Sequence, residues 1–214
     1  MIELKNISVI YNEDSANEIH ALKKVSLNVL PQEFVVVIGS NGSGKSTLLN
    51  AIAGTLFPKE GTISIDNIDV SKKKEFQRAA FISRIFQNPL MGTAPELSIL
   101  ENFRLASLRT KTKGFTIGTS KDFEEKVKEK ISFLKMGLEN YIYKPMGTLS
   151  GGQRQALTLV MGIMDECKIM LLDEPVAALD PRSANLVMEK ANEIIAENKI
   201  TALMVTHQLK DALK

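Results

Sequence analysis

The chain has 214 residues, of which 44% are hydrophobic and 24% are charged, so it can form one domain with a sizeable core and is not a disordered segment. Lys and Arg number 27 and Asp and Glu number 25, and a net charge of +2 leaves no basic footprint for binding nucleic acid. We expect no membrane-spanning helix, no signal peptide and, with Cys167 as the single cysteine, no intrachain disulfide, which fits a reducing compartment.

The first third of the chain predicts strands around a glycine-rich loop. Apolar residues alternate in segments 2–9, 22–29 and 63–65, as in half-buried strands. The run FVVVI at 34–38 is continuously apolar and β-branched, which predicts a strand buried on both faces of a parallel sheet. After the loop, TLLNAIAG predicts a helix that ends at Gly54, and FISRIF predicts a further strand.

The middle of the chain predicts helices. The segments are PELSILENFRLASL at 95–108 and KDFEEKVKEKISFLKMG at 121–137, the second with Gly137 as its stop. Its apolar residues at helical spacing are Phe123, Val127, Ile131 and Leu134. Residues 109–120 between the two helices are basic and contain glycine, which predicts a solvated loop. Helices inserted into a strand–helix alternation indicate a subdomain.

The alternation of strands and helices returns in the last third. Ile169 to Leu172 predicts a strand that ends at Asp173, and Asp180 before Pro181 predicts a capped helix start. A helix should follow, and then the strand ITALMVT at 200–206. The fold class is therefore α/β, with a parallel sheet that is covered on both faces.

The strongest chemical signal is the sequence GSNGSGKST, which fits G-x-x-x-x-G-K-[ST] between a strand and a helix. Its residues are Gly39, Ser40, Asn41, Gly42, Ser43, Gly44, Lys45, Ser46 and Thr47. Glycines allow the backbone N–H groups to surround a phosphate, Lys45 adds a charge for the β- and γ-phosphates, and Ser46 offers a hydroxyl to Mg²⁺. The alternative is a chance glycine-rich turn, which would have to meet both flanking elements by accident.

A second signal lies in KIMLLDE at 168–174. The strand carries Asp173 to its carboxyl end, where parallel sheets bind ligands and a carboxylate can hold Mg²⁺. Glu174 follows, placed to polarise an attacking water. Alone, an apolar run before Asp-Glu usually marks a strand that meets solvent. Together with the phosphate loop it predicts a nucleoside triphosphatase.

The third element is LSGGQ, which opens a helix with Ser150 as the N-cap. A capped helix start would explain an isolated SGG. Placed ahead of the Asp-Glu strand, however, LSGGQRQ resembles the signature of ATP-binding-cassette (ABC) ATPases, and the resemblance covers essentially the whole chain. It implies one nucleotide-binding domain over residues 1–214 with the fold of a P-loop NTPase. A RecA-like core with an antiparallel β subdomain would occupy about 1–87 and 162–214, and a helical subdomain about 88–161.

The resemblance implies that ATP and Mg²⁺ bind between two copies of the chain, which face head to tail. The signature of one copy would contact the ATP that lies on the phosphate loop of the other. The signature residues are Leu149, Ser150, Gly151, Gly152 and Gln153. Ser150 and Gly152 would touch the γ-phosphate held by the partner's Lys45.

Further residues match single positions of the ABC pattern. Gln87, in FQNP, matches the loop that senses Mg²⁺ and water and contacts the transport partner, so that the expected metal contacts are Ser46, Gln87 and Asp173. Glu174 matches the general base, and the catalytic set is Glu174, His207, Gln87 and Lys45.

Four residues lie outside the main motifs, and three of them match the ABC pattern. Asp180 in AALD matches the loop that crosses the dimer interface, and His207 matches the switch histidine that hydrogen-bonds the γ-phosphate. Tyr11 matches the aromatic residue that stacks on adenine, although local packing of a strand-end tyrosine stays open. His20 has no match and is predicted to be a surface or structural residue.

Only a resemblance to one group of ABC ATPases bears on which substrate is transported. FQNPLMGTAPELSILENF followed by LSGGQRQALTLVM is similar to ATPase subunits of bacterial importers proposed to carry aromatic amino acids such as tryptophan. This implies membrane permease subunits, an extracytoplasmic substrate-binding protein, no nucleic-acid partner, and a peripheral location on the cytoplasmic face of the membrane.

Other functions stay open at this point. NEIHALKKVSL is shared with exporter and lipoprotein-release ATPases, and a soluble ABC ATPase is a further alternative. A non-catalytic nucleotide-binding scaffold is a third, against which the intact catalytic motifs argue. Members of the family usually continue past the switch histidine, so we expect an exposed edge or apolar face where this chain stops at Lys214.

Overall fold

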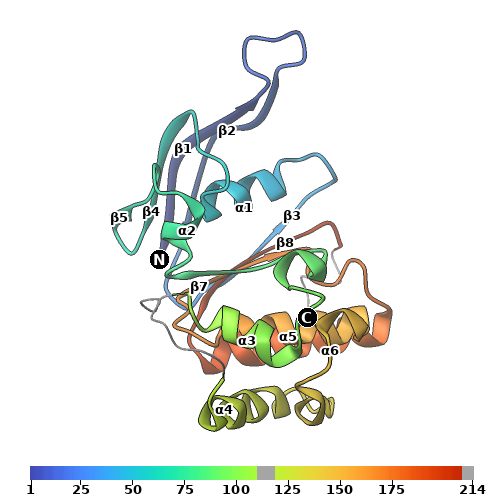
Figure 1. The fold of residues 1–214 in the computed structure, drawn as a ribbon. Coiled ribbons are helices and arrows are strands. Elements are labelled where there is room, and N and C mark those ends of the chain that lie inside the picture. Colours follow the sequence, from blue (N-terminus) through green and yellow to red (C-terminus); the bar gives the residue numbers. More distant parts are fainter. Residues whose placement is uncertain (110–118, 209–214) are drawn as a thin grey trace.

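A computed structural model describes residues 1–109 and 119–208 of the chain, in which two sheets are covered by helices (Figure 1). An antiparallel sheet has the strand order β2-β1-β4-β5, with β1 (Ile2–Tyr11), β2 (Ile19–Val29), β4 (Glu60–Ile65) and β5 (Ile68–Asp69). A parallel sheet has the order β3-β8-β7-β6, with β3 (Phe34–Ile38), β6 (Ile82–Ile85), β7 (Ile169–Asp173) and β8 (Thr201–Thr206). The predicted α/β class is confirmed.

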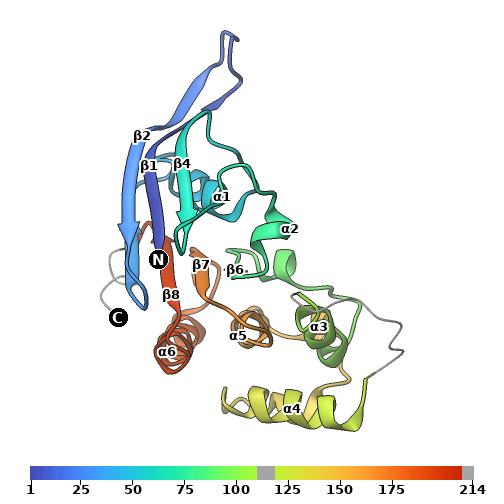
Figure 2. The same ribbon diagram turned by 90° about the vertical axis from the view of Figure 1, so that its left-hand side faces the viewer.

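The helices lie on the two faces of the parallel sheet. They are α1 (Lys45–Ala53), α2 (Glu75–Arg78), α3 (Ile99–Ala106), α4 (Lys121–Ser132), α5 (Gly151–Gly162) and α6 (Pro181–Glu197). Three short 3₁₀ turns are η1 (Pro89–Gly92), η2 (Leu138–Tyr141) and η3 (Met146–Thr148). Helices α3, α5 and α6 lie side by side below the sheet, and α4 lies beyond them (Figure 2). Among the described residues, no helix combines the length and the apolar character needed to cross a membrane.

The alternation of side chains along β7 divides the core in two. Ile169 and Leu171 belong to a cluster that includes α1 and the antiparallel sheet. Met170 and Leu172 point to the opposite face and belong to a cluster that includes α3, α4, α5 and α6. Because successive strand residues face opposite sides, one strand anchors both layers. The division into a core and a helical subdomain near residues 88 and 161 stays a prediction.

Some sequence-based boundaries were wrong. The strand β3 is half-buried rather than buried on both faces, because it lies at the edge of its sheet and pairs only with β8. The first helix of the middle segment begins at Ile99 instead of residue 95, since Ser98 and Glu101 form a capping box. Helix α4 ends at Ser132, and Gly137 is instead the N-cap of η2, with φ of 71°. Most of the predicted loop at 109–120, and the end of the chain, lie outside the described residues.

A fully buried arginine closes the end of helix α1. Arg78 Nη1 donates hydrogen bonds to the carbonyl oxygens of Ala51 (2.7 Å) and Ile52 (2.8 Å), and its Nε donates to Lys73 O (2.8 Å). Burial lowers the pKa of Arg78 to about 10, which leaves it charged at neutral pH. A cation at a helix C-terminus satisfies carbonyl groups that have no partner within the helix. Arg78 therefore fixes the helix that follows the phosphate loop.

The replacement Arg78→Met keeps the aliphatic stem but leaves these buried carbonyl oxygens without donors. We expect a loss of about 2–4 kcal/mol in the free energy of unfolding, measured by urea denaturation. The melting temperature should fall by roughly 5–15 °C. Arg182→Met, at an exposed position of α6, is the matched control and should change stability by less than about 0.5 kcal/mol. Equal melting temperatures for the two variants would contradict the assignment.

Candidate nucleotide-binding site

The parallel sheet gathers the predicted site residues at one edge. Strand β8 lies between β3 and β7, with Ile38 in register with Thr206 and Asp173 in register with Val205. All three strands run in the same direction, so their carboxyl ends meet. The loop after β3, the Asp-Glu pair at the end of β7 and the histidine after β8 are therefore neighbours.

The phosphate loop needs glycine at specific positions. Gly42 and Gly44 have φ of 81° and 89°, in the left-handed region that glycine adopts without strain. A Cβ on Gly44 would lie 2.5 Å from the carbonyl oxygen of Ala21 in β2, so the loop packs directly on a neighbouring backbone. The Lys45 Nζ donates to the carbonyl oxygens of Gly39 and Ser40, each at 2.8 Å. The loop is thus closed around its own lysine, with α1 starting at that residue.

An oxygen pair suited to Mg²⁺ lies beside the loop. Ser46 Oγ donates to Asp173 Oδ1 at 3.1 Å, which joins the start of α1 to the end of β7. Hydroxyl and carboxylate oxygens are hard donors, and Mg²⁺ completes its shell with waters and substrate phosphates. Within residues 1–109 and 119–208, no three His, Cys, Asp or Glu side chains gather into a metal site of their own. The residues fit a metal that arrives with a nucleotide.

The second carboxylate, Glu174, contacts two of the predicted catalytic side chains. Its Oε2 is 2.9 Å from His207 Nδ1 and accepts a hydrogen bond from Gln87 Nε2 at 3.5 Å. Its backbone has φ of 44°, uncommon for a residue other than glycine, and its N–H donates to Val205 O at 3.0 Å. The structure thus brings Glu174, His207 and Gln87 together from three different segments.

The signature residues form a capped helix terminus away from these contacts. Ser150 Oγ accepts from the N–H of Gln153, and the Gln153 side chain accepts from the N–H of Ser150. A Cβ on Gly152 would lie 2.7 Å from the side chain of Ser183 in α6, so this glycine permits close helix packing. Within the described part of the chain, the hydrogen bonds of Ser150 join it to its own helix and not to the phosphate loop.

Asp180 caps helix α6, as predicted. Its Oδ1 accepts from the backbone N–H groups of Arg182 and Ser183, both at 3.1 Å, and hydrogen bonds from Ser183 hold the pKa of the Asp180 carboxyl below its usual range. The carboxylate is therefore a stable anion at the start of the helix.

Tyr11 and His20, which both lie in the antiparallel sheet, differ in their surroundings. Tyr11 ends β1, and its hydroxyl shares a hydrogen bond of 3.3 Å with Thr47 Oγ1, which places the ring next to the first turn of α1. His20 is exposed and pairs with Glu18 at 2.8 Å, in agreement with a surface residue.

Two buried polar side chains at the site were not predicted. Arg84 Nη2, from β6, donates to Asp173 Oδ2 at 3.3 Å. Gln155, fully buried in α5, donates from Nε2 to Phe86 O (3.0 Å) and Pro175 O (2.8 Å), and so ties the signature helix to the segments that hold Gln87 and Glu174. The signal was present in the sequence: a charge inside the apolar strand FISRIF and an amide inside an apolar helix need buried partners.

These features define a phosphate-loop nucleoside triphosphatase. The sequence profile of the ABC transporter family matches residues 22–177, and the chain belongs to this family. The tyrosine transport ATP-binding protein of Clostridioides difficile is 37% identical over 217 residues, covering 100% of this chain and 85% of its own. The thiamine import ATP-binding protein ThiQ of Shigella sonnei is 32% identical over 214 residues, with shares of 100% and 84%.

A solved structure agrees with the sequence relatives. The dimeric post-hydrolysis state of the ATP-binding cassette MJ0796, bound to ADP and Pi, superposes with a TM-score of 0.84 at 30% identity, covering 99% of this chain and 90% of that one. The predicted family, the P-loop fold and the ATPase class are confirmed. The roles of individual residues stay predictions, and Tyr11, Asp180 and His207 lie outside the residues that the family profile matches.

Two glycines of the phosphate loop provide a matched test of its packing. A Cβ at Gly42 would have nothing within 4 Å, whereas a Cβ at Gly44 would meet the Ala21 backbone. We expect Gly42→Ala to cost about 1–2 kcal/mol, for left-handed strain alone. Gly44→Ala should cost a further 1–3 kcal/mol or so, because backbone must move. Urea denaturation without nucleotide measures both, and equal stabilities would show that the close approach does not constrain the loop.

Proposed function

We propose that this chain is the ATP-hydrolysing subunit of an ABC transporter that imports an amino acid, working as a head-to-tail pair. The observation that carries the proposal is the position of Glu174, whose Oε2 meets both His207 and Gln87 next to the Ser46–Asp173 pair. A carboxylate held at this point can accept a proton from a water that attacks the γ-phosphate.

Each residue at the sheet edge would do one part of the work. The phosphate loop binds the phosphates through backbone N–H groups, and Lys45 would exchange its two carbonyl contacts for phosphate oxygens. Mg²⁺, when bound with ATP, neutralises phosphate charge; Ser46, Asp173 and Gln87 are the residues that would hold it. His207 would hold the γ-phosphate and keep Glu174 oriented through their shared contact.

The signature supports action between two copies. Ser150 and Gly151 are exposed at the start of a 12-residue helix, whose first N–H groups suit an anion. Because the hydrogen bonds of Ser150 to residues 1–109 and 119–208 stay within its own helix terminus, a phosphate held by another copy is the natural ligand. The resemblance to a dimeric cassette bound to ADP and Pi supports this arrangement.

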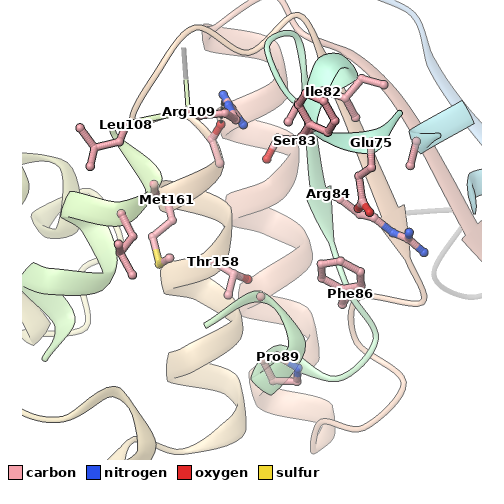
Figure 3. A pocket seen from close by; sticks show the side chains of 17 residues that line it. Glu75, Ile82, Ser83, Arg84, Phe86, Pro89, Leu108, Arg109, Thr158 and Met161 are labelled. Atoms are coloured by element: carbon pink, nitrogen blue, oxygen red, sulfur yellow. Dashed lines mark hydrogen bonds between the residues drawn. The ribbon is translucent and has the colours of Figure 1, made fainter. Parts of the chain in front are cut away.

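A pocket of about 840 Å³ supports a permease partner. It lies between β6 and helices α3 and α5, close to the Gln87 segment, and Figure 3 shows Phe86 and Pro89 facing Thr158 and Met161 across it. Phe76 and Leu105, also in its lining, are 74% and 55% exposed. Large exposed apolar side chains around a hollow mark a protein-binding surface, and a short cytoplasmic segment of the membrane subunit is the occupant that transport requires.

The most specific part of the proposal is the identity of the transported substrate. The relative from Clostridioides difficile is named for tyrosine transport, and this supports an aromatic amino acid as cargo. The chain would then work on the cytoplasmic face of the membrane, with an extracytoplasmic substrate-binding protein delivering the amino acid. An ATPase that is not coupled to transport, and an exporter, stay as alternatives; co-purification with the permease separates the first of these.

The replacement Glu174→Gln tests whether Glu174 is the base. It keeps the size of the side chain and removes the proton acceptor. If Glu174 is the base, turnover should fall at least about a hundredfold, or roughly 2.7 kcal/mol in the barrier, while ATP binding survives. The variant should then form a dimer in Mg-ATP and a monomer in Mg-ADP, measured by size-exclusion chromatography with light scattering.

Two results would end this assignment: normal turnover, or a monomer at saturating ATP. Weakened Mg-ATP binding would make Glu174 a metal ligand instead. The matched control is Glu166→Gln, since Glu166 lies in the loop before β7, whereas Glu174 follows the opposite end of that strand. It should hydrolyse ATP at the wild-type rate.

Mixing two inactive variants tests whether the signature acts on the other copy. Lys45→Ala removes the cation of the phosphate loop but keeps the signature, and Ser150→Arg blocks the signature but keeps the loop. Each variant alone should be inactive, and Ser150→Arg should still bind ATP as a monomer. A mixed dimer contains one site with an intact loop and an intact signature, so an equal mixture should recover up to about a quarter of wild-type turnover.

Phosphate release during titration of one variant into the other measures this recovery. An activity that rises and then falls with the mixing ratio supports action between copies. A mixture that stays inactive, together with loss of ATP binding by monomeric Ser150→Arg, would mean that the serine acts in the site of its own chain.

A further inference from the structure

Arg84 is a largely buried cation that the functions described above do not use. It lies on β6 at the edge of the parallel sheet, and its side chain is only 12% exposed. Its Nη2 donates to Asn50 Oδ1 at 2.6 Å and to Asp173 Oδ2 at 3.3 Å. Among the described residues its Nε is buried without a hydrogen-bond acceptor. An unsatisfied buried donor costs about 1–3 kcal/mol, so stability alone would favour an apolar residue here.

Arg84 contacts one carboxylate oxygen of Asp173, and the other oxygen faces Ser46 at the start of α1. Oδ2 accepts from Arg84, whereas Oδ1 accepts from Ser46. A carboxylate held at both oxygens cannot rotate freely about its last bond. Asn50 in α1 accepts a hydrogen bond from the same Nη2, so the arrangement joins β6, β7 and the helix that follows the loop.

Arg84 also reaches the pocket between β6 and helices α3 and α5. Its guanidinium carbon lies 4.6 Å from the centre of the Phe86 ring, and both residues line the pocket. Figure 3 shows Phe86 beside the strand and the Arg84 side chain extending away from α5. The Arg84 side chain therefore contacts both Phe86, in the lining of the pocket, and Asp173, at the carboxyl end of β7.

We infer that Arg84 is a positioning residue that orients Asp173 for Mg²⁺ and links this carboxylate to the pocket through Phe86. The inference rests on the proposed function, because it takes Asp173 as a residue that holds Mg²⁺ and the pocket as the permease site. Movement of Phe86 by an occupant would shift the guanidinium, and with it the Oδ1 that faces Ser46.

A positive charge near a metal site also has an opposing effect. Two cations repel each other, so removal of Arg84 could tighten Mg²⁺ binding if charge were all that mattered. We expect the orienting effect to dominate, because Arg84 contacts Oδ2 and so holds Asp173 with Oδ1 next to Ser46. The two effects have opposite signs and can be separated by measurement.

Titration calorimetry with a non-hydrolysable ATP analogue, in excess Mg²⁺ and in EDTA, gives the ratio of the two dissociation constants. We expect Arg84→Met to reduce the affinity gain from Mg²⁺ about tenfold, the size of a lost charge-assisted hydrogen bond. Affinity in EDTA should change by less than about twofold, since the phosphate loop is untouched. Arg84→Lys, which keeps the charge but can reach fewer partners, should recover part of the gain.

The matched control is Arg104→Met. Arg104 also stacks on a phenylalanine, Phe123, at 5.5 Å, but lies on α3 and belongs to the helical part. The Arg104→Met variant should keep the wild-type ratio of the dissociation constants measured in EDTA and in excess Mg²⁺. An Arg84→Met ratio equal to that of Arg104→Met, or an increased gain from Mg²⁺, would overturn the inference.

A double-mutant cycle tests the link to the pocket. Phe86→Leu removes the ring under Arg84 and should reduce the gain from Mg²⁺ about two- to fivefold, as expected for a cation–π contact. In the Arg84→Met background the same change should have no further effect. Additive losses would refute the link through Phe86.

The variant Asp173→Asn separates failure of this inference from failure of the proposed function. If Asp173→Asn keeps the full gain from Mg²⁺, Asp173 does not hold the metal and the proposed site is wrong. If it loses the gain and Arg84→Met keeps it, the proposed site stands and only the role of Arg84 falls.

Discussion

The parallel pairing of β3, β8 and β7 is the constraint on which the site depends. It brings the carboxyl ends of three strands together, although β3 ends at Ile38 and β7 and β8 end at Asp173 and Thr206. The glycine-rich loop, the Asp173–Glu174 pair and His207 each follow one of these strands. A shift of one residue in this register would turn Asp173 away from Ser46 and part Glu174 from His207.

Buried polar side chains hold this edge to the helices around it. Arg78 closes the C-terminus of α1, Gln155 ties α5 to the segments around Gln87 and Glu174, and Arg84 joins β6 to Asp173. Each of them donates hydrogen bonds to oxygens of the backbone or of neighbouring side chains, which offsets part of the cost of leaving water. Gln155 therefore connects the helix that carries the signature to the segment that follows Glu174, the proposed base, while Ser150 and Gly151 at the start of this helix are exposed.

Under the proposed function, this arrangement would give a physical route between a membrane partner and ATP. The pocket beside β6 has apolar walls that an inserted segment can fill, and Phe86 in its lining lies under Arg84. The backbone of Phe86 is also held by Gln155, one residue before Gln87. A change at the pocket would reach both carboxylates through packed side chains and hydrogen bonds, without passing through the solvent.

The sequence by itself determined the family, the phosphate loop and the strand–helix order, because these depend on local spacing: glycines at fixed offsets, apolar runs and capping residues. It also placed Asp180 and Ser150 as N-caps, which need only neighbours in the chain. The half-burial of β3 was missed because only the strand order puts it at the sheet edge. Arg84 and Gln155 were missed because their partners lie 89 and 20 residues away and are brought close by the tertiary fold alone.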